Sequence, residues 1–298
     1  MKKYLYLLLV PMLIISFSTL LHAQQEDSLE VEEEFEEFDD DFDTDFDVSV
    51  DIGIFEHPYI GLNYGMTQLK SSLSNQNFQE IGRVSLKLGY YTQENYDSDY
   101  LIKHKNKYIY LNNFSEDLYK AKIVQPVQIS AWQFGFGNEK GYGYKFGPAA
   151  IIPYVVSDYS WTQIKYDLSK TGPDSVLLGL YYDFFRFGQT AGSGIQLQIF
   201  PLISLDANYS FGLVFPRHLF WKHLGSLVVE EIASSSLDWF IKKIIKFTPE
   251  AAPIVNFVLK SGLSYAFFEL RKDKMNWPFN TASPLTNESF NLGMKFNF

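Results

Sequence analysis

The chain has 298 residues, of which 46% are hydrophobic and 17% aromatic, and its formal net charge is −10. It contains no cysteine, which excludes a disulfide framework, a thiolate metal site and a cysteine nucleophile. A mean hydropathy of −0.11 excludes a protein made of many membrane helices, because each helix would need an apolar run of about 20 residues.

Residues 1–23 have the organisation of a secretory signal peptide. Lys2 and Lys3 form a charged start, residues 5–21 are apolar, and Ala23 precedes a polar segment. An uncleaved membrane anchor is the alternative, since the apolar run is nearly long enough to span a bilayer. We expect cleavage after Ala23 and export from the cytoplasm.

The negative charge is concentrated in a tail. Residues 26–51 contain 15 acidic residues and no basic one, whereas residues 52–298 hold 20 acids and 23 bases, a net charge of +3. Such dense like charge predicts a disordered segment over residues 24–56. An acidic chain also argues against nucleic acid as a partner, so none is expected.

Apolar residues interrupt the acidic tail at helical spacing. Val31 is followed at intervals of four, three, four and four by four phenylalanines, Phe35, Phe38, Phe42 and Phe46. Three interpretations remain open: a solvated spacer, a phenylalanine-anchored motif for a periplasmic protein partner, or a calcium site. The last has the weakest support, because Asp41, Asp43 and Asp45 open like an EF-hand loop that then lacks its glycine and closing glutamate.

From residue 57 onward, apolar and polar residues alternate. Three runs show the pattern most clearly, with apolar residues at every second position over 60–66, 84–90 and 203–213. Period-two alternation places all apolar side chains on one face of a strand. Long segments, aromatics near segment ends (Tyr59, Tyr90, Tyr91, Tyr154, Tyr159, Trp161 and Phe215) and a Gly, Ser, Asn and Gln-rich polar face favour a transmembrane barrel over a soluble periplasmic β protein.

The pattern predicts an all-β fold, a transmembrane antiparallel β-barrel of about ten strands, with eight to twelve open because residues 107–112 can also pair. The ten segments are 58–68, 81–92, 126–137, 142–155, 157–167, 176–188, 194–200, 203–214, 258–271 and 287–298. Ten strands would put residues 215–257 on the same side of the membrane as both termini.

The last strand carries the most specific signal. Five apolar residues, Phe290, Leu292, Met294, Phe296 and Phe298, alternate with polar ones, and the sequence stops on Phe298. Together with the signal peptide and the strand pattern of residues 57–298, this resembles the Gram-negative outer-membrane β-barrel superfamily. The resemblance implies an outer-membrane location, contact with outer-membrane lipid, and recognition of the closing strand by the barrel-assembly machinery.

Residues 218–260 break the strand pattern and predict a helical insertion, with its core over 218–257. Leu237, Phe240, Ile241, Ile244 and Ile245 follow helical spacing, and Trp239, Lys242, Lys243 and Lys246 fall on other faces. Ser236 is the expected N-cap, and Thr248 with Pro249 the expected end. The alternatives are packing against the barrel rim, a plug or interfacial amphipathic helix, and a docking surface for a partner.

Residues that could carry chemistry are few. His218, His223 and Ser226 cluster but fit an aromatic and basic interfacial belt better than a catalytic set, and His57 and His104 are isolated. No catalytic residue, metal site or cofactor is therefore predicted. Five charged residues near polar faces predict an internal ion-pair network: Arg83, Lys87, Asp206, Glu269 and Lys295.

These observations predict three parts: a signal peptide (1–23), an acidic tail in the periplasm (24–56) and a barrel with a helical insertion (57–298). The favoured function is non-enzymatic, a structural or partner-binding component of the outer membrane. The alternatives are a narrow channel or ligand transporter, and a barrel enzyme that modifies lipid.

Overall fold

The computed structural model describes residues 57–71, 80–96, 98–118, 129–166 and 179–298. The signal peptide predicted over 1–23 and the acidic tail predicted over 24–56, with its phenylalanines 35, 38, 42 and 46, lie outside the described residues.

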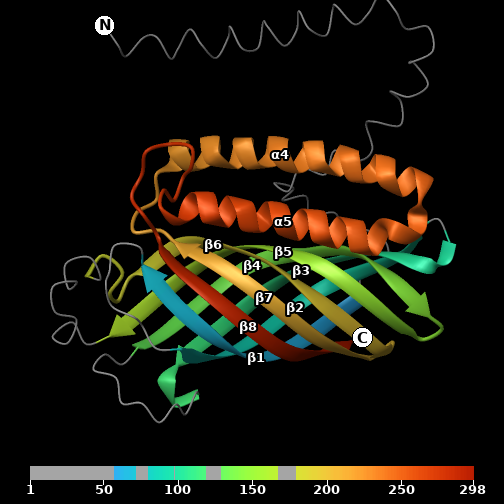
Figure 1. The fold of residues 1–298 in the computed structure, drawn as a ribbon. Helices are drawn as coiled ribbons and strands as arrows, with labels where there is room; N and C mark the ends of the chain where they lie inside the picture. Colours follow the sequence, from blue (N-terminus) through green and yellow to red (C-terminus); the bar gives the residue numbers. More distant parts are fainter. Residues whose placement is uncertain (1–56, 72–79, 97, 119–128, 167–178) are drawn as a thin grey trace, which may run out of the picture. The chain divides into compact units, whose positions relative to one another are not determined.

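Eight antiparallel strands form a closed barrel in which each strand pairs with its neighbour in sequence and β1 pairs with β8 (Figure 1). The strands are β1 (His57–Ser71), β2 (Ile81–Tyr96), β3 (Ser98–Ser115), β4 (Ile129–Phe146), β5 (Ala149–Tyr166), β6 (Phe185–Phe200), β7 (Ile203–Val214) and β8 (Leu285–Asn297). They are 12 to 18 residues long, enough for tilted strands to cross a bilayer.

The two ends of the barrel differ. The end that carries His57 and Phe298 also carries the short connections β2–β3, β4–β5 and β6–β7, and we call it the turn end. The opposite end, the loop end, carries the longer connections β1–β2, β3–β4, β5–β6 and β7–β8.

The prediction of about ten strands is wrong by two, although eight lies within the range considered. β3 was missed because its wall-facing residues at the turn end, Lys103, Lys105 and Lys107, are basic and hide the alternation. The segment 142–155 contains the turn between β4 and β5, where Gly147 adopts a φ of 63°. Segment 176–188 enters a strand only at Phe185, and 258–271 is helical.

The barrel is polar inside and apolar outside. On β2, Ser85 and Lys87 are buried in the interior, whereas Val84, Leu86 and Leu88 are exposed on the wall. The same alternation holds on β1 and β8, so the apolar face predicted from the sequence is confirmed as the outer one. A soluble β protein would bury its apolar face instead.

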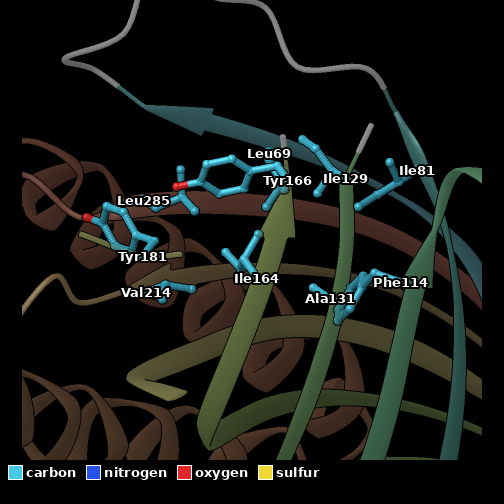
Figure 2. Close-up of a cluster of buried hydrophobic side chains, with 10 residues drawn as sticks. All are labelled: Leu69, Ile81, Phe114, Ile129, Ala131, Ile164, Tyr166, Tyr181, Val214 and Leu285. Atoms are coloured by element: carbon cyan, nitrogen blue, oxygen red, sulfur yellow. The ribbon is translucent and has the colours of Figure 1, made fainter. Parts of the chain in front are cut away.

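A layer of apolar side chains closes the interior at the loop end. Its members come from seven strands and from the β5–β6 connection: Leu69, Ile81, Phe114, Ile129, Ala131, Ile164, Tyr166, Tyr181, Val214 and Leu285 (Figure 2). Burial raises the pKa of the Tyr181 hydroxyl above its usual value, so it stays protonated at neutral pH. At the turn end Ile102, Ala150 and Ile152 form a smaller cluster.

Two helices connect β7 to β8. α4 (Phe220–Phe247) and α5 (Ala252–Lys272) are joined by a short 3₁₀ turn, η5 (Pro249–Ala251), and run side by side along the outside of the barrel (Figure 1). The predicted end at Thr248 and Pro249 is confirmed, but Ser236 is not an N-cap. It lies within α4, where its hydroxyl donates to the Ile232 carbonyl oxygen.

The hairpin starts and finishes at the loop end, because β7 ends there and β8 begins there. The expectation that residues 215–257 lie on the side of the termini is therefore wrong for the roots of the hairpin, because seven strands precede the hairpin and not the eight that the sequence predicted. The tip does reach the turn end. There the Tyr144 hydroxyl donates to the Glu250 carbonyl oxygen over 2.6 Å, and the Tyr100 hydroxyl donates to the Glu250 carboxylate over 3.3 Å.

Candidate functional site: barrel interior and helical hairpin

A charged network occupies the middle of the barrel. The Glu139 carboxylate accepts hydrogen bonds from the Lys87 ammonium over 2.7 Å, from the Lys295 ammonium over 2.6 Å and from the Asn106 amide over 2.7 Å. Glu139 and Lys295 are almost completely buried. The two ammonium groups thus compensate the desolvation of the carboxylate. Without such partners, burying this charge would be strongly unfavourable.

A second carboxylate extends this network. The Asp206 carboxylate lies 3.5 Å from the Lys295 ammonium and accepts from the Tyr154 hydroxyl over 2.6 Å and from the Asn208 amide over 2.8 Å. Nearby, the Tyr108 hydroxyl donates to Asp158 over 2.6 Å. These contacts join strands β2, β3, β4, β5, β7 and β8 across the interior.

Three of the five charges predicted for the interior are members of this network: Lys87, Lys295 and Asp206. Arg83 is buried in the interior with its guanidinium 5.5 Å from the centre of the Phe114 ring. Glu269 was predicted wrongly, because it lies on α5, where it pairs with Lys272.

Glu139, the centre of the network, was missed. The outward phase set by Trp132, Phe134 and Phe136 places Gln133 and every second residue after it in the interior, and Glu139 has this phase. The inward position of Glu139 was therefore predictable by extending the alternation of β4 from residues 132–136 to residue 139.

The interior is filled by side chains. Six polar residues of its central layers are each at most 2% exposed, Ser85, His104, Asn106, Asn112, Glu139 and Lys295. A water-filled pore would expose its lining, whereas an eight-stranded barrel has an interior just wide enough for side chains to fill. Among the described residues this packing, with the apolar layer at the loop end, does not support the channel alternative.

The aromatic residues predicted for a membrane girdle divide between the two faces. Tyr59 and Tyr154 are buried inside, because they share the inward phase of their strands, and Phe215 is buried beside α5. On the outer wall, Phe134 stacks on Trp161 with ring centres 5.6 Å apart, and Tyr159 stacks on Phe187 at 6.1 Å. The outward aromatic residues of β4, β5 and β6 thus contact one another on the wall, and Tyr90 is exposed on β2.

The loop-end half of the hairpin is held by Arg271. Its guanidinium pairs with Glu230 of α4 over 2.8 Å and donates to the Ser226 hydroxyl over 2.9 Å and to the Gln189 side chain of β6 over 3.1 Å. Further along, Lys260 of α5 bonds Asp238 over 2.7 Å and Ser234 over 2.8 Å. A polar seam therefore runs between the two helices.

The His and Ser residues near the start of α4 do not form a nucleophile–base pair. The Ser226 hydroxyl donates to the Trp277 carbonyl oxygen over 2.6 Å and accepts from Arg271. His223 packs against the rings of Phe187 and Phe215, at 5.4 and 5.5 Å. Among the residues that the structure places, no group of three or more His, Asp or Glu side chains is arranged to hold a metal ion.

The apolar stripe predicted on the helix faces inward only in part. Ile241 and Ile245 are buried in a cluster with Ala252, and Leu237 and Ile244 are half-buried. Trp239, Phe240, Lys242, Lys243 and Lys246 are exposed, and the Lys243 ammonium lies 3.7 Å from the centre of the Trp239 ring. The hairpin packs on the outside of the barrel, so it is not a plug of the interior.

The apolar residues of the closing strand, Phe290, Leu292, Met294 and Phe296, are exposed on the outer wall, and so is the terminal Phe298. β8 pairs with both β1 and β7, and the Phe298 amide donates to the Pro58 carbonyl oxygen over 2.9 Å, closing the barrel at the turn end. The outward position of the predicted assembly signal is thus as expected. Its recognition by the assembly machinery stays a prediction.

A closed antiparallel barrel with an apolar wall, a polar interior and a terminal aromatic strand defines a class. The protein is an outer-membrane-type transmembrane β-barrel of eight strands, with a helical hairpin on its wall.

The chain is similar in fold to several solved structures. Neisserial surface protein A is 13% identical, with 81% of this chain and 97% of that chain covered and a TM-score of 0.40. Ail, the attachment invasion locus protein of Yersinia pestis, is 7% identical over 82% and 100%, with a TM-score of 0.34. A major outer membrane protein from Thermus thermophilus is 10% identical over 81% and 99%, at 0.30.

No protein-family model and no curated protein matches the sequence. At such low identities and TM-scores, the likeness to these structures carries no argument about function, and the class rests on the geometry of the barrel itself.

Proposed function

We propose that this protein is a non-enzymatic component of the outer membrane in which the barrel is an anchor and the acidic segment 24–56 binds a periplasmic protein partner. The observation that carries the proposal is the packed interior. Glu139 and Lys295 are bonded to each other and sealed from solvent, so the barrel's central layers are built for rigidity.

The arrangement of the hydroxyl and imidazole groups supports the non-enzymatic part of the proposal. Ser226 is bonded to a backbone carbonyl and to Arg271, and neither group can act as a general base toward its hydroxyl. The outward positions of β1, β2, β7 and β8 carry exposed apolar side chains that suit outer-membrane lipid, the other partner of the barrel.

The end of the barrel at which β1 starts supports a periplasmic location for the tail. β1 starts at the turn end, beside the C-terminus, and short connections are typical of the periplasmic side of such barrels. A tail that precedes His57 then extends into the periplasm once a signal peptide has been removed.

The test distinguishes the contribution of the phenylalanines to partner binding from that of the acidic residues. The full-length protein is compared with a variant that lacks residues 24–51 and with one in which Phe35, Phe38, Phe42 and Phe46 are all serine and every acid is kept. Chemical crosslinking in intact cells, followed by mass spectrometry, should give a periplasmic partner with the parent protein only. Equal crosslinking of the serine variant would show that the acidic residues and not the phenylalanines bind the partner, and equal crosslinking of the deletion would overturn the proposal.

A further inference from the structure

The outer face of α4 carries an exposed apolar stripe. Five residues at helical spacing contribute most of it, Trp221, Leu224, Val228, Ile232 and Trp239, and all are exposed. In a water-soluble helix this face would be polar, because exposing so much apolar surface to water is unfavourable.

The stripe has the length of a membrane's hydrocarbon layer. Trp221 and Trp239 are 18 residues apart, which at 1.5 Å per residue is about 27 Å. The apolar band of an outer-membrane barrel is about 25 Å tall, and tryptophans concentrate at its two borders. α5 matches this length, since Pro249–Lys272 is apolar and long enough by composition to span a bilayer.

Basic residues mark both ends of the stripe. Lys222 follows the tryptophan at the loop end, and Lys243 and Lys246 follow the tryptophan at the turn end. Lysine and tryptophan at a hydrocarbon border place their apolar parts in the bilayer and their polar parts among headgroups. The contact between Lys243 and the Trp239 ring has this character.

Charged residues of the two helices pair with one another. Lys260 is paired with Asp238, and Arg271 with Glu230, in the seam between the helices and the barrel. The cations are the more buried members of these pairs: 5% of the Arg271 side chain and 16% of the Lys260 side chain are exposed, against 33% for Glu230 and 46% for Asp238. Ionisable groups are tolerated within a bilayer when they pair in this way.

The wall under and beside α5 is adapted to a protein neighbour. The outward positions Asn138 and Lys140 of β4 and Ala191 and Ser193 of β6 are small or polar, and they are half-buried. Away from the hairpin, outward positions carry large exposed apolar side chains, such as Ile109 and Leu292. α5 thus replaces the apolar wall on this side, and the outer face of α4 continues it.

From these observations we infer that the α4–α5 hairpin is immersed in the bilayer beside the barrel, crosses the hydrocarbon layer from the loop end to the turn end and returns, and presents the outer face of α4 to lipid acyl chains. The surface is independent of the acidic tail and of any partner that the tail binds.

The absence of cysteine permits a direct test with single probes. Val228→Cys in the middle of the stripe, Phe247→Cys at the tip and Leu111→Cys on the barrel wall are each labelled with an environment-sensitive fluorophore in the full-length protein. The proteins are folded into phosphatidylcholine vesicles that hold lipids spin-labelled at mid-chain or at the headgroup. Folding of each variant is verified by heat-modifiable migration on detergent gels.

Residue 228 should emit at short wavelength, be quenched at least twice as strongly by the mid-chain label as by the headgroup label, and resist aqueous iodide, like the probe at residue 111. Residue 247 should be quenched mainly by the headgroup label. Quenching of residue 228 by iodide, with residue 111 still protected, would show that the hairpin lies in water beside a correctly inserted barrel and would overturn the inference.

Discussion

Replacing Glu139 by glutamine should destabilise the barrel more than any exchange of a surface charge. The substitution keeps the shape of the side chain but removes the charge that compensates Lys87 and Lys295 at 2.7 and 2.6 Å. Lys295 retains Asp206 at 3.5 Å and the Gln196 side chain at 2.9 Å, whereas the Lys87 ammonium retains the Tyr108 ring, 4.2 Å from the ring centre. Breaking one partner out of a buried ion pair costs about 3–5 kcal/mol.

Because Lys295 keeps a second carboxylate, we expect the lower part of that range, a loss of about 3 kcal/mol. Urea unfolding in lipid vesicles, followed by tryptophan fluorescence, measures the free energy of unfolding. Lys70→Met is the matched control, since Lys70 pairs with Glu288 at 3.0 Å but is half-exposed, and exposed pairs contribute about 0–1 kcal/mol. Adding Lys87→Met to Glu139→Gln should recover part of the loss. A Glu139→Gln variant as stable as Lys70→Met would refute the account of the interior.

Three further predictions concern the hairpin, the closure of the barrel and the interior. Arg271→Met should loosen the hairpin and speed amide exchange in α4 at least tenfold while the strands stay protected, whereas Lys272→Met should not; unchanged exchange would show that the Glu230 pair is dispensable. Gly65→Val should prevent closure between β1 and β8, because its new side chain meets the backbone carbonyl of Phe290, while Gly179→Val, which meets no atom of the described residues within 4 Å, should give normal heat-modifiable migration. The purified protein should give no steady conductance in planar bilayers, and discrete open levels of single-channel size would contradict the closed interior.

The class of the fold was predictable from the sequence because a bilayer on one side of each strand and a polar interior on the other require apolar and polar residues to alternate. On β1, β2, β7 and β8 one face must meet lipid, so every second residue is apolar and the strands are visible. β3 escaped because its outward residues near the turn end are lysines. The alternation is also weak on the parts of β4 and β6 that α5 covers, because outward residues there contact a helix and can be small or polar.

The helical insertion was predicted in kind but not in extent. The stripe of Ile241 and Ile245 is visible because those residues pack against Ala252, but α5 was taken for a strand over 258–271. α5 buries apolar residues against the barrel and exposes Ile254, Val258 and Tyr265 on another side, so it is apolar nearly all round, which hides the 3.6-residue period. The interior network was predicted in part, since Lys87, Lys295 and Asp206 were found and Glu139 was not.

The central claim, a barrel that is apolar outside and packed inside, is tested most directly by two adjacent residues of one strand. Leu86 faces outward and is exposed, and Ser85 faces inward and is buried. Single cysteines at these two positions, treated with a lipid-soluble maleimide in folded vesicles, should differ. The account predicts rapid labelling of residue 86 with quenching by mid-chain spin-labelled lipid, and labelling of residue 85 only after unfolding. Equal labelling of both residues, or protection of residue 86 with access at residue 85, would contradict it.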